Sequence, residues 1–482
     1  MKILLASSEM HPFSKTGGLA DMVGALAKTL ARKGNKIGLV TPLYAGIRDQ
    51  FRGIKPFDWE IDLAMGPRRV QAKVFTTNLG PRLTVYFIQQ PDYFERAGLY
   101  QEKGREYTDN AERFIFLSKC IAQLARYLPW KPELVHAHDW QVGLVPLFIQ
   151  HQSRHEGWSG APRTCLTIHN MAYQGVFPAA HYPLTNLPHG YLNPNGIEFY
   201  GKFNCLKAGI VFADTITTVS PRYAQEIMTE TFGCGLHGLM QKRKSSLHGI
   251  LNGVDYDEWK TTGNPFLKHS YSARNLFGKA TIKLELQKEL GLPTNAHVPL
   301  FVTVGRLADQ KGMDILLGAL EEMLPADLQF AMLGSGDPKL ENAFRELAIR
   351  YPEKVAARVG FDEALSHRME AGADFFLMPS RYEPCGLNQM YSQRYGTIPI
   401  VRATGGLDDS VVDVGDDPVN ASGLKFTDLS PPALSKCIRK ALSIFQSAEI
   451  LRHFRLNGMA ADFSWERTAE QYLRVYELAL GG

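Results

Sequence analysis

The chain has 482 residues, of which 45% are apolar and 21% are charged, a balance typical of a globular protein. This length is too great for one ordinary hydrophobic core, so we expect two domains. The net charge is only +4 and the basic residues are scattered, which excludes a nucleic-acid-binding face and predicts no nucleic-acid partner.

The sequence also argues against a membrane or secreted protein. No run approaches the roughly 20 apolar residues of a membrane span. The first five residues resemble a strand rather than a signal peptide. The six cysteines are widely spaced and form no CxxC pair, which fits reduced thiols. We therefore expect a cytoplasmic protein with no membrane partner.

Short apolar runs alternate with helical patterns through the first half of the chain. Near-continuous apolar strands separated by helices predict a parallel sheet covered on both faces. One region breaks this rhythm, because residues 51–107 hold several β-like segments and a polar loop, 98–107, which we expect to be mobile and part of the active site. The expected strands are 3–6, 36–41, 83–88, 134–137, 164–168 and 215–219, and the expected helices are 111–126, 142–150 and 203–212.

The same alternation restarts in the second half. Its expected strands are 300–304, 329–333, 356–359, 375–378 and 399–402, again with helices between them. The fold class is therefore α/β with two Rossmann-like halves, divided in the polar stretch 253–265. Ligands of open α/β sheets bind beyond the carboxyl ends of the strands, so two such sheets facing each other would form a deep cleft.

The run from Lys15 to Met22 carries the most specific signal in the first half. Gly17 and Gly18 lie where a strand gives way to a helix, and glycine lets the backbone approach a ligand because it has no Cβ. The helix N-terminus adds free N–H groups, Lys15 adds a positive charge, and Asp21 follows in the first turn. These features favour a binding site for an anion or a sugar diphosphate. The alternative is an ordinary strand-to-helix turn that binds no ligand.

Two cations follow the first strand of the second half. Arg306 can hold a diphosphate as a two-pronged donor, and Lys311 can do so as a point charge. In a transfer reaction they would also stabilise the charge that develops on the departing group. The alternative is a pair of surface cations in a loop before a helix.

A carboxylate and a glycine-containing turn follow the strand at 375–378. Glu383 lies at the end of this strand, and the N–H groups of Gly386 and Leu387 lie at the start of the next helix. A carboxylate can hold sugar hydroxyls while the helix start meets phosphate, although Glu383 could also be a favourable charge in a first helical turn. Cys385 has no base or second cysteine nearby, so we expect a small packing residue close to the ligand.

A second glycine turn comes after the strand at 399–402. Thr404, Gly405 and Gly406 repeat the logic of the first turn, because their backbone N–H groups could bind the sugar or the distal phosphate. Taken alone, this turn is a weak signal.

Together these motifs resemble those of bacterial glycogen synthases and plant starch synthases, which transfer glucose from a nucleotide sugar. The resemblance extends from the run at Lys15 through the R-x4-K-G pattern at Arg306 and the E-P-C-G-L element at Glu383 to the last helix. Related sucrose and sugar transferases have a second glutamate eight positions after the first. Here that position is Tyr391, which favours the glycogen and starch synthase branch.

The resemblance implies a GT-B fold and assigns roles to several residues. It places His169 near the transferring glucose, and it places Asn170 and Asp139 against sugar hydroxyls. Without the resemblance, these residues could equally be strand-end residues that satisfy loop backbone. A zinc site at His136 and His138 is a further alternative for this region, but no Cys or carboxylate pattern completes a tetrahedral site.

Further residues carry over from the resemblance with less support. Asn252 matches an asparagine beside the donor, Tyr100 matches a loop tyrosine, and Phe361 falls where relatives stack an aromatic ring on adenine. A core position is the alternative for Phe361. The expected domains are 1–252 on the acceptor side, 253–457 for the nucleotide sugar, and 458–482 as a C-terminal helix that returns to the first domain.

The implied activity is retaining transfer of glucose from ADP-glucose to the non-reducing end of an α-1,4-glucan, either glycogen or a maltooligosaccharide. The resemblance implies no metal and no cofactor, which is chemically reasonable because Arg306 and Lys311 can supply the positive charge for the diphosphate. No carboxylate can be assigned as a covalent nucleophile, so we favour front-face displacement, in which the leaving phosphate helps to take the acceptor proton. Two alternatives stay open: a UDP-sugar transferase with a small acceptor, and an inactive glucan-binding protein.

Overall fold

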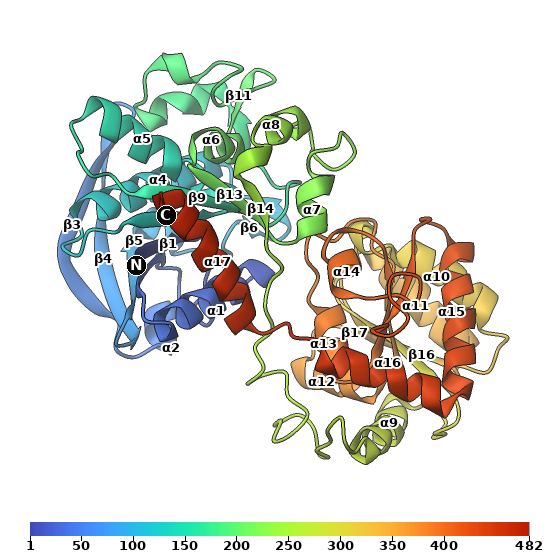
Figure 1. Cartoon of the computed structure of the whole chain (residues 1–482). Helices are drawn as coiled ribbons and strands as arrows, with labels where there is room; N and C mark the ends of the chain where they lie inside the picture. Colours follow the sequence, from blue (N-terminus) through green and yellow to red (C-terminus); the bar gives the residue numbers. More distant parts are fainter. Residues whose placement is uncertain (482) are drawn as a thin grey trace. The chain divides into compact units, whose positions relative to one another are not determined.

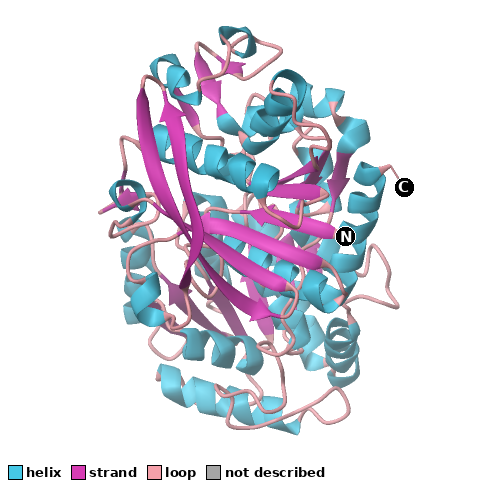
Figure 2. Ribbon diagram, turned by 90° about the vertical axis from the view of Figure 1, so that its left-hand side faces the viewer, coloured by secondary structure: helices cyan, strands magenta, loops and turns pink. Residues whose placement is uncertain are grey.

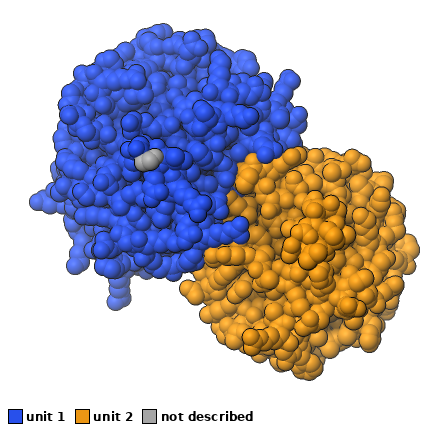
Figure 3. Space-filling model, viewed as in Figure 1, with its two compact units in different colours: residues 1–219, 224–250, 465–482 blue, residues 220–223, 251–464 orange. Residues whose placement is uncertain are grey.

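The computed structural model describes residues 1–481, which form two compact units (Figure 3). Unit 1 comprises Met1–Val219, Ala224–Ile250 and the chain from Trp465 onward, and unit 2 comprises Ser220–Tyr223 and Leu251–Ser464. Residues 458–464 thus belong to unit 2, and the segment that returns to unit 1 begins later than the predicted position 458. None of the helices within residues 1–481 is long and apolar enough to cross a bilayer.

Unit 1 is built on a nine-stranded sheet. Its first seven strands in spatial order are parallel; β4 then pairs antiparallel with β5, and β3 pairs antiparallel with β4. The order is β14 (Leu247–Gly249), β13 (Thr215–Thr218), β9 (Arg163–Ile168), β8 (Leu134–His138), β1 (Lys2–Ala6), β2 (Lys36–Pro42), β5 (Leu83–Gln89), β4 (Arg68–Gly80) and β3 (Lys55–Met65).

Helices and small strands complete unit 1. The helices are α1 (Gly18–Arg32), α2 (Ile47–Gln50), α3 (Pro91–Phe94), α4 (Asn110–Tyr127), α5 (Val145–His155), α6 (Cys205–Phe212), α8 (His237–Lys242) and α17 (Trp465–Leu480), while α7 (Pro221–Glu226) is divided between the units. Two smaller sheets contain β10 (Val176–Pro178), β11 (Glu198–Phe199) and β12 (Lys202–Asn204), and β6 (Gln101–Glu102) with β7 (Arg105–Glu106). In Figure 1 the last helix, α17 in red, lies beside α1 in blue, and the two helices are in contact.

Unit 2 is built on a six-stranded sheet that is parallel throughout. Its order is β17 (Val355–Val359), β16 (Gln329–Gly334), β15 (Leu300–Val304), β18 (Phe375–Met378), β19 (Ile398–Arg402) and β20 (Leu424–Phe426). The helices are α9 (Phe277–Leu290), α10 (Met313–Met323), α11 (Pro338–Arg350), α12 (Glu363–Gly372), α13 (Asn388–Arg394), α14 (Gly405–Ser410), α15 (Pro431–Gln446) and α16 (Ala448–Ala460). Figure 2 shows the strands in magenta and the helices in cyan.

The alternation of side chains along β15 explains why this sheet is covered on both faces. Phe301 packs into one buried cluster, whereas its neighbours Leu300 and Val302 pack into another. Successive side chains of a strand point to opposite faces, so an apolar run of this kind needs a helical layer on each side. The prediction of two Rossmann-like halves is therefore confirmed. All eleven expected strands are present, and β14 and β20 are additional edge strands.

Candidate functional site

A buried carboxylate organises the loop between β1 and α1. Glu9 is 3% exposed, and its side chain accepts hydrogen bonds from the Thr16 backbone N–H (2.5 Å), the Thr16 hydroxyl (2.9 Å) and the Tyr100 hydroxyl (2.8 Å). Burial raises the pKa of Glu9, while these donors favour the ionised form. Glu9 therefore fixes the loop that carries the predicted Lys15 motif.

The Lys15 motif itself lies at an exposed corner of unit 1. Gly17 has an extended backbone, and a Cβ built there would meet nothing within 4 Å. No side chain caps the start of α1, where both Gly17 and Gly18 are exposed. Lys15 Nζ forms a 2.8 Å ion pair with Asp21. The structure thus brings these four predicted residues together beside the open N-terminus of α1.

Tyr100 is anchored from several directions. Its hydroxyl also lies 2.7 Å from the Ser8 hydroxyl, and its carbonyl accepts a hydrogen bond from Asn110 (3.0 Å). Arg113, which is completely buried, donates to the preceding carbonyl of Leu99 (2.9 Å). The base of the predicted mobile loop is therefore held in place, and β6 and β7 form a small hairpin beyond it.

Three histidines form a row at the carboxyl ends of β8 and β9. His138 Nδ1 lies 3.1 Å from His169 Nε2, and the rings of His136 and His138 are 4.1 Å apart. His136 lies 2.7 Å from the Tyr476 hydroxyl and 2.6 Å from the Thr167 hydroxyl. Because both of its nitrogens have partners, the zinc alternative is left without His136 as a ligand.

Burial keeps this histidine row neutral. It lowers the pKa of His136 and of His169 to about 3, and it lowers the pKa of His138 well below its usual range. A neutral imidazole donates through one nitrogen and accepts through the other, so His169 is suited to hydrogen bonding with a sugar hydroxyl rather than to carrying a charge.

Asp139 orients the backbone beside His169. It has a left-handed φ of +62°, uncommon for a non-glycine residue, and its carboxylate accepts the backbone N–H groups of His169 (2.7 Å) and Asn170. Burial raises the pKa of Asp139 to about 7. The Asn170 side chain accepts the N–H of Ala172 (3.0 Å), which closes the turn. Asp139, His169 and Asn170 therefore form one connected group.

An ion pair lies at the centre of the predicted residues of unit 2. Lys311 Nζ is 2.5 Å from Glu383 Oε2, which also accepts a hydrogen bond from the Ser380 hydroxyl (3.1 Å). Glu383 is 6% exposed. Gly312 makes this approach possible, because its φ is +65° and a Cβ there would lie 2.0 Å from the Pro379 carbonyl oxygen.

A second contact joins the same two loops. Arg381 makes two hydrogen bonds of 2.8 Å to the Asp314 carboxylate, and its backbone N–H donates to the Gln310 carbonyl (2.8 Å). The two-pronged geometry fixes the loop after β15 against the loop after β18. Lys311 and Glu383 are therefore held on a rigid base.

The turn at Thr404–Gly406 packs against the Glu383 loop. A Cβ at Gly405 would lie 2.0 Å from the Glu383 carbonyl oxygen, and a Cβ at Gly406 would lie 2.1 Å from that of Cys385. The Gly406 N–H donates to the Glu383 carbonyl (3.1 Å). In this structure the two glycines permit close backbone packing, and the Gly406 N–H that we expected to meet a ligand is engaged within the protein.

The other predicted residues of unit 2 lie around this ion pair or on the surface. Arg306 is exposed, and within residues 1–481 no ion pair of its side chain is found.

Asn252 is buried, and its Oδ1 has no hydrogen-bond partner among the described atoms. Its backbone N–H faces Cys385, whose pKa burial raises to about 12, so this thiol is inert. Phe361 is 91% exposed, which excludes its alternative as a core residue.

The comparisons with known proteins cover both units. Residues 2–242 match the family described as "Starch synthase catalytic domain", and residues 285–453 match "Glycosyl transferases group 1". The chain is 47% identical to a glycogen synthase of Anaeromyxobacter sp. (strain Fw109-5) over 99% of each chain, and 41% identical to glycogen synthase 2 of Nitrosococcus oceani over 99% of this chain and 97% of the other. The chain belongs to the glycogen and starch synthase family.

Solved structures agree with this family. The catalytic domain of starch synthase IV from Arabidopsis thaliana, bound to ADP and acarbose, has a TM-score of 0.90 and 33% identity, covering 100% of this chain and 99% of the other. A sucrose-phosphate synthase from Thermosynechococcus elongatus, at 18% identity and a TM-score of 0.60, shares the fold. This chain is thus a glycosyltransferase of the GT-B class.

Glu9 was missed by the motif analysis, and His138 was considered there only as a possible zinc ligand. Glu9 lies three residues after β1 and His138 ends β8, so both lie at carboxyl ends of parallel strands, where α/β proteins bind ligands. That position was the only signal available, because neither residue stands within a glycine turn.

We expect Glu9→Gln to lower kcat/KM on the order of tenfold, because an amide has one acceptor oxygen and loses the charge-assisted bonds that fix the loop at Thr16. Tyr100→Phe removes a single donor and should have a smaller effect. Steady-state kinetics of both variants with donor and glucan would measure this. Unchanged kcat/KM in Glu9→Gln would contradict a positioning role.

The raised pKa of Asp139 predicts a pH effect on stability. Between pH 4 and 7 the folded protein holds this proton while the unfolded chain releases it, so the stability that Asp139 contributes decreases as pH rises through this range. Asp139→Asn cannot titrate. The free energy of unfolding of the variant, relative to the original chain, should therefore increase between pH 4.5 and 7.5 in denaturant titrations. A constant difference would show that Asp139 is ionised throughout.

Proposed function

We propose that this enzyme transfers glucose from ADP-glucose to the non-reducing end of an α-1,4-glucan with retention of configuration. The observation that carries the proposal is the ion pair between the partly exposed Lys311 and the buried Glu383, beyond the carboxyl ends of β15 and β18. It places a cation suited to phosphate beside a carboxylate suited to sugar hydroxyls. The relative that was solved with ADP and acarbose supports this choice of donor and acceptor.

The unit 2 residues divide between the two parts of the donor. Arg306, exposed and without an ion pair in the described structure, and Lys311 bind the diphosphate and stabilise the charge that grows as ADP leaves. Glu383 holds glucosyl hydroxyls, because the negative diphosphate would repel it. Lys311 then exchanges part of its contact with Glu383 for phosphate oxygens.

The remaining unit 2 residues line the donor. Phe361 offers an exposed ring for the adenine, and the unsatisfied Asn252 oxygen offers an acceptor. The backbone at Gly386 and Leu387 meets phosphate. Cys385 packs beneath the ligand, together with the turn formed by Thr404, Gly405 and Gly406.

The unit 1 residues act on the sugar and the acceptor. His169, a neutral imidazole, and its neighbours Asp139 and Asn170 hold glucosyl hydroxyls. Lys15, Gly17, Gly18 and Asp21 form the phosphate-facing corner, and Tyr100 completes its wall. That one donor molecule contacts both sets of residues stays a prediction.

We propose front-face displacement for the chemical step. The bond between the anomeric carbon and the diphosphate oxygen breaks, the acceptor hydroxyl oxygen bonds to that carbon from the same face, and its proton passes to the departing phosphate. Arg306 and Lys311 stabilise the leaving group in this step.

Labelled donors test the activity. The purified chain is incubated with glycogen and either ADP-[14C]glucose or UDP-[14C]glucose, and label in precipitated polymer is counted. We expect incorporation from ADP-glucose in α-1,4 linkages that α-amylase releases. A preference for UDP-glucose would favour the transferase alternative, and glucan binding without incorporation would favour the inactive-protein alternative.

Lys311→Ala should lower kcat on the order of 10²-fold, because it removes one electrostatic contact to the leaving group. Lys339→Ala is the matched control, since Lys339 is an exposed lysine of unit 2 at the start of α11. Steady-state kinetics with ADP-glucose measure both variants. Turnover at the original rate in Lys311→Ala would remove this residue from the mechanism.

Glu383→Gln separates the sugar from the nucleotide. The variant keeps its size but loses the charge that strengthens hydrogen bonds to the glucosyl hydroxyls, so kcat should decrease by at least about tenfold. ADP lacks the sugar, and the variant frees Lys311 from its ion pair, so the affinity for ADP in calorimetry should not decrease. Equal weakening of ADP and ADP-glucose with intact turnover would make Glu383 a nucleotide-site residue.

A further inference from the structure

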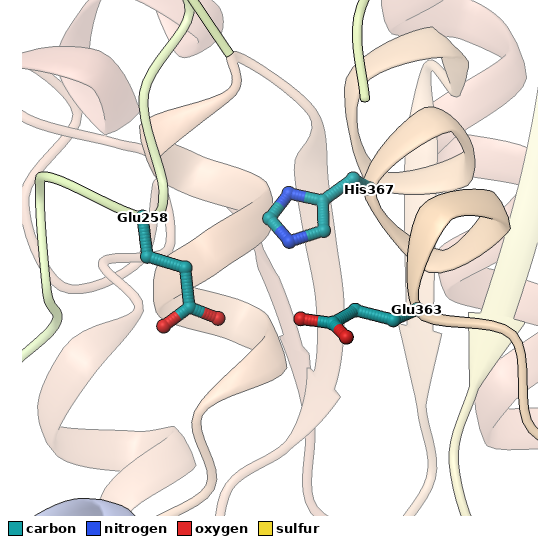
Figure 4. A group of neighbouring side chains, drawn as sticks. All are labelled: Glu258, Glu363 and His367. Atoms are coloured by element: carbon teal, nitrogen blue, oxygen red, sulfur yellow. The ribbon is translucent and has the colours of Figure 1, made fainter. Parts of the chain in front are cut away.

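Outside the predicted donor site, unit 2 gathers three potential metal ligands. Glu258, Glu363 and His367 each offer one donor atom, and these atoms lie within 4.8 Å of one another (Figure 4). Glu363 and His367 are four residues apart on α12 and so share one face of the helix, while Glu258 comes from the loop before Trp259. Within residues 1–481 this is the only such group.

His367 provides the observation that points to a ligand. It is 0% exposed, its Nδ1 lies 2.7 Å from the Tyr395 hydroxyl, and its Nε2 has no hydrogen-bond partner in the described structure. Figure 4 shows this second nitrogen directed toward the two carboxylates. A buried polar atom without a partner costs free energy, and a bound cation would remove that cost.

The surroundings of His367 match those of a metal-binding histidine. The Tyr395 hydroxyl already accepts a hydrogen bond from the Asn264 amide (2.9 Å), so its second lone pair can accept from His367 Nδ1–H. This leaves the Nε2 lone pair directed at the carboxylates. Metal-bound histidines commonly have such an outer hydrogen bond, which fixes ring orientation.

We propose that Glu258, Glu363 and His367 bind a divalent zinc ion. One imidazole and two carboxylates suit zinc better than calcium or magnesium, which prefer oxygen ligands alone. Ligand atoms bound at about 2.0–2.2 Å lie closer together than 4.8 Å, so the ends of the two glutamates must move inward. Both glutamates are exposed and can do so, while His367 is fixed and water completes the coordination.

The ion would join two parts of unit 2 that are distant in sequence. The Trp259 ring stacks on His367 with centroids 4.1 Å apart, so the loop that carries Glu258 is already packed on α12. Zinc would add a bond between them and stabilise unit 2. This role is independent of the transfer reaction, since none of the three ligands belongs to the proposed donor site.

Zinc binding to the full-length chain tests the proposal. After chelator treatment and dialysis, zinc chloride is titrated by calorimetry into the original chain, Glu258→Gln, Glu363→Gln, the double variant, and Glu346→Gln as an exposed helical control. We expect one site of micromolar or better affinity, weakened at least about tenfold by each ligand variant and unchanged in Glu346→Gln. Zinc should raise the melting temperature of the original chain and not that of the double variant.

X-ray absorption of the zinc-loaded original chain provides a readout that does not depend on the variants folding. Nitrogen and oxygen scatterers at about 2.0–2.2 Å support the site, whereas a sulfur scatterer would assign the zinc to a cysteine such as the exposed Cys234. The proposal is also overturned if the double variant binds zinc like the original chain, or if the original chain binds none up to about 100 μM.

Discussion

A buried carboxylate is costly unless hydrogen-bond donors or a cation surround it, and each unit of this enzyme places one just beyond a parallel strand. In unit 1, Glu9 follows β1 and receives donors from Thr16 and Tyr100. In unit 2, Glu383 follows β18 and is paired with Lys311. In both cases the requirement to satisfy the carboxylate fixes the loop that bears the residues proposed to bind phosphate.

The two carboxylates nevertheless leave different surfaces for ligands. Glu9 is satisfied by neutral donors, so the charge of Lys15 is shared only with Asp21 at an exposed corner. Glu383 is satisfied by Lys311 itself, so any ligand phosphate that binds Lys311 must compete with Glu383 for this cation. In the proposed reaction, a diphosphate that attracts Lys311 would weaken the contact between Lys311 and Glu383 and so make that carboxylate available to sugar hydroxyls. Binding of one part of the donor can thus prepare the site for the other.

The local sequence was enough to predict the strands and the types of residue at the candidate site. The runs at Leu300–Val304 and Phe375–Met378 were predicted at their observed bounds because an apolar run flanked by glycine and proline is a local property. The Lys311–Glu383 contact was not predictable in this way, since 72 residues separate the partners and the order of β15 and β18 in the sheet decides it. The role of Gly405 depends likewise on the neighbouring Glu383 backbone.

The last helix shows how far such long-range contacts extend. Tyr476 of α17 is hydrogen-bonded to His136, the His136 ring lies against His138, and His138 contacts His169. The three rings are thus in contact through one hydrogen bond, between His138 and His169, and one ring packing, between His136 and His138. The packing of His138 against His136 therefore links the surroundings of His169 to a hydroxyl near the end of the chain. This link gives α17 a part in organising the site as well as in covering the sheet.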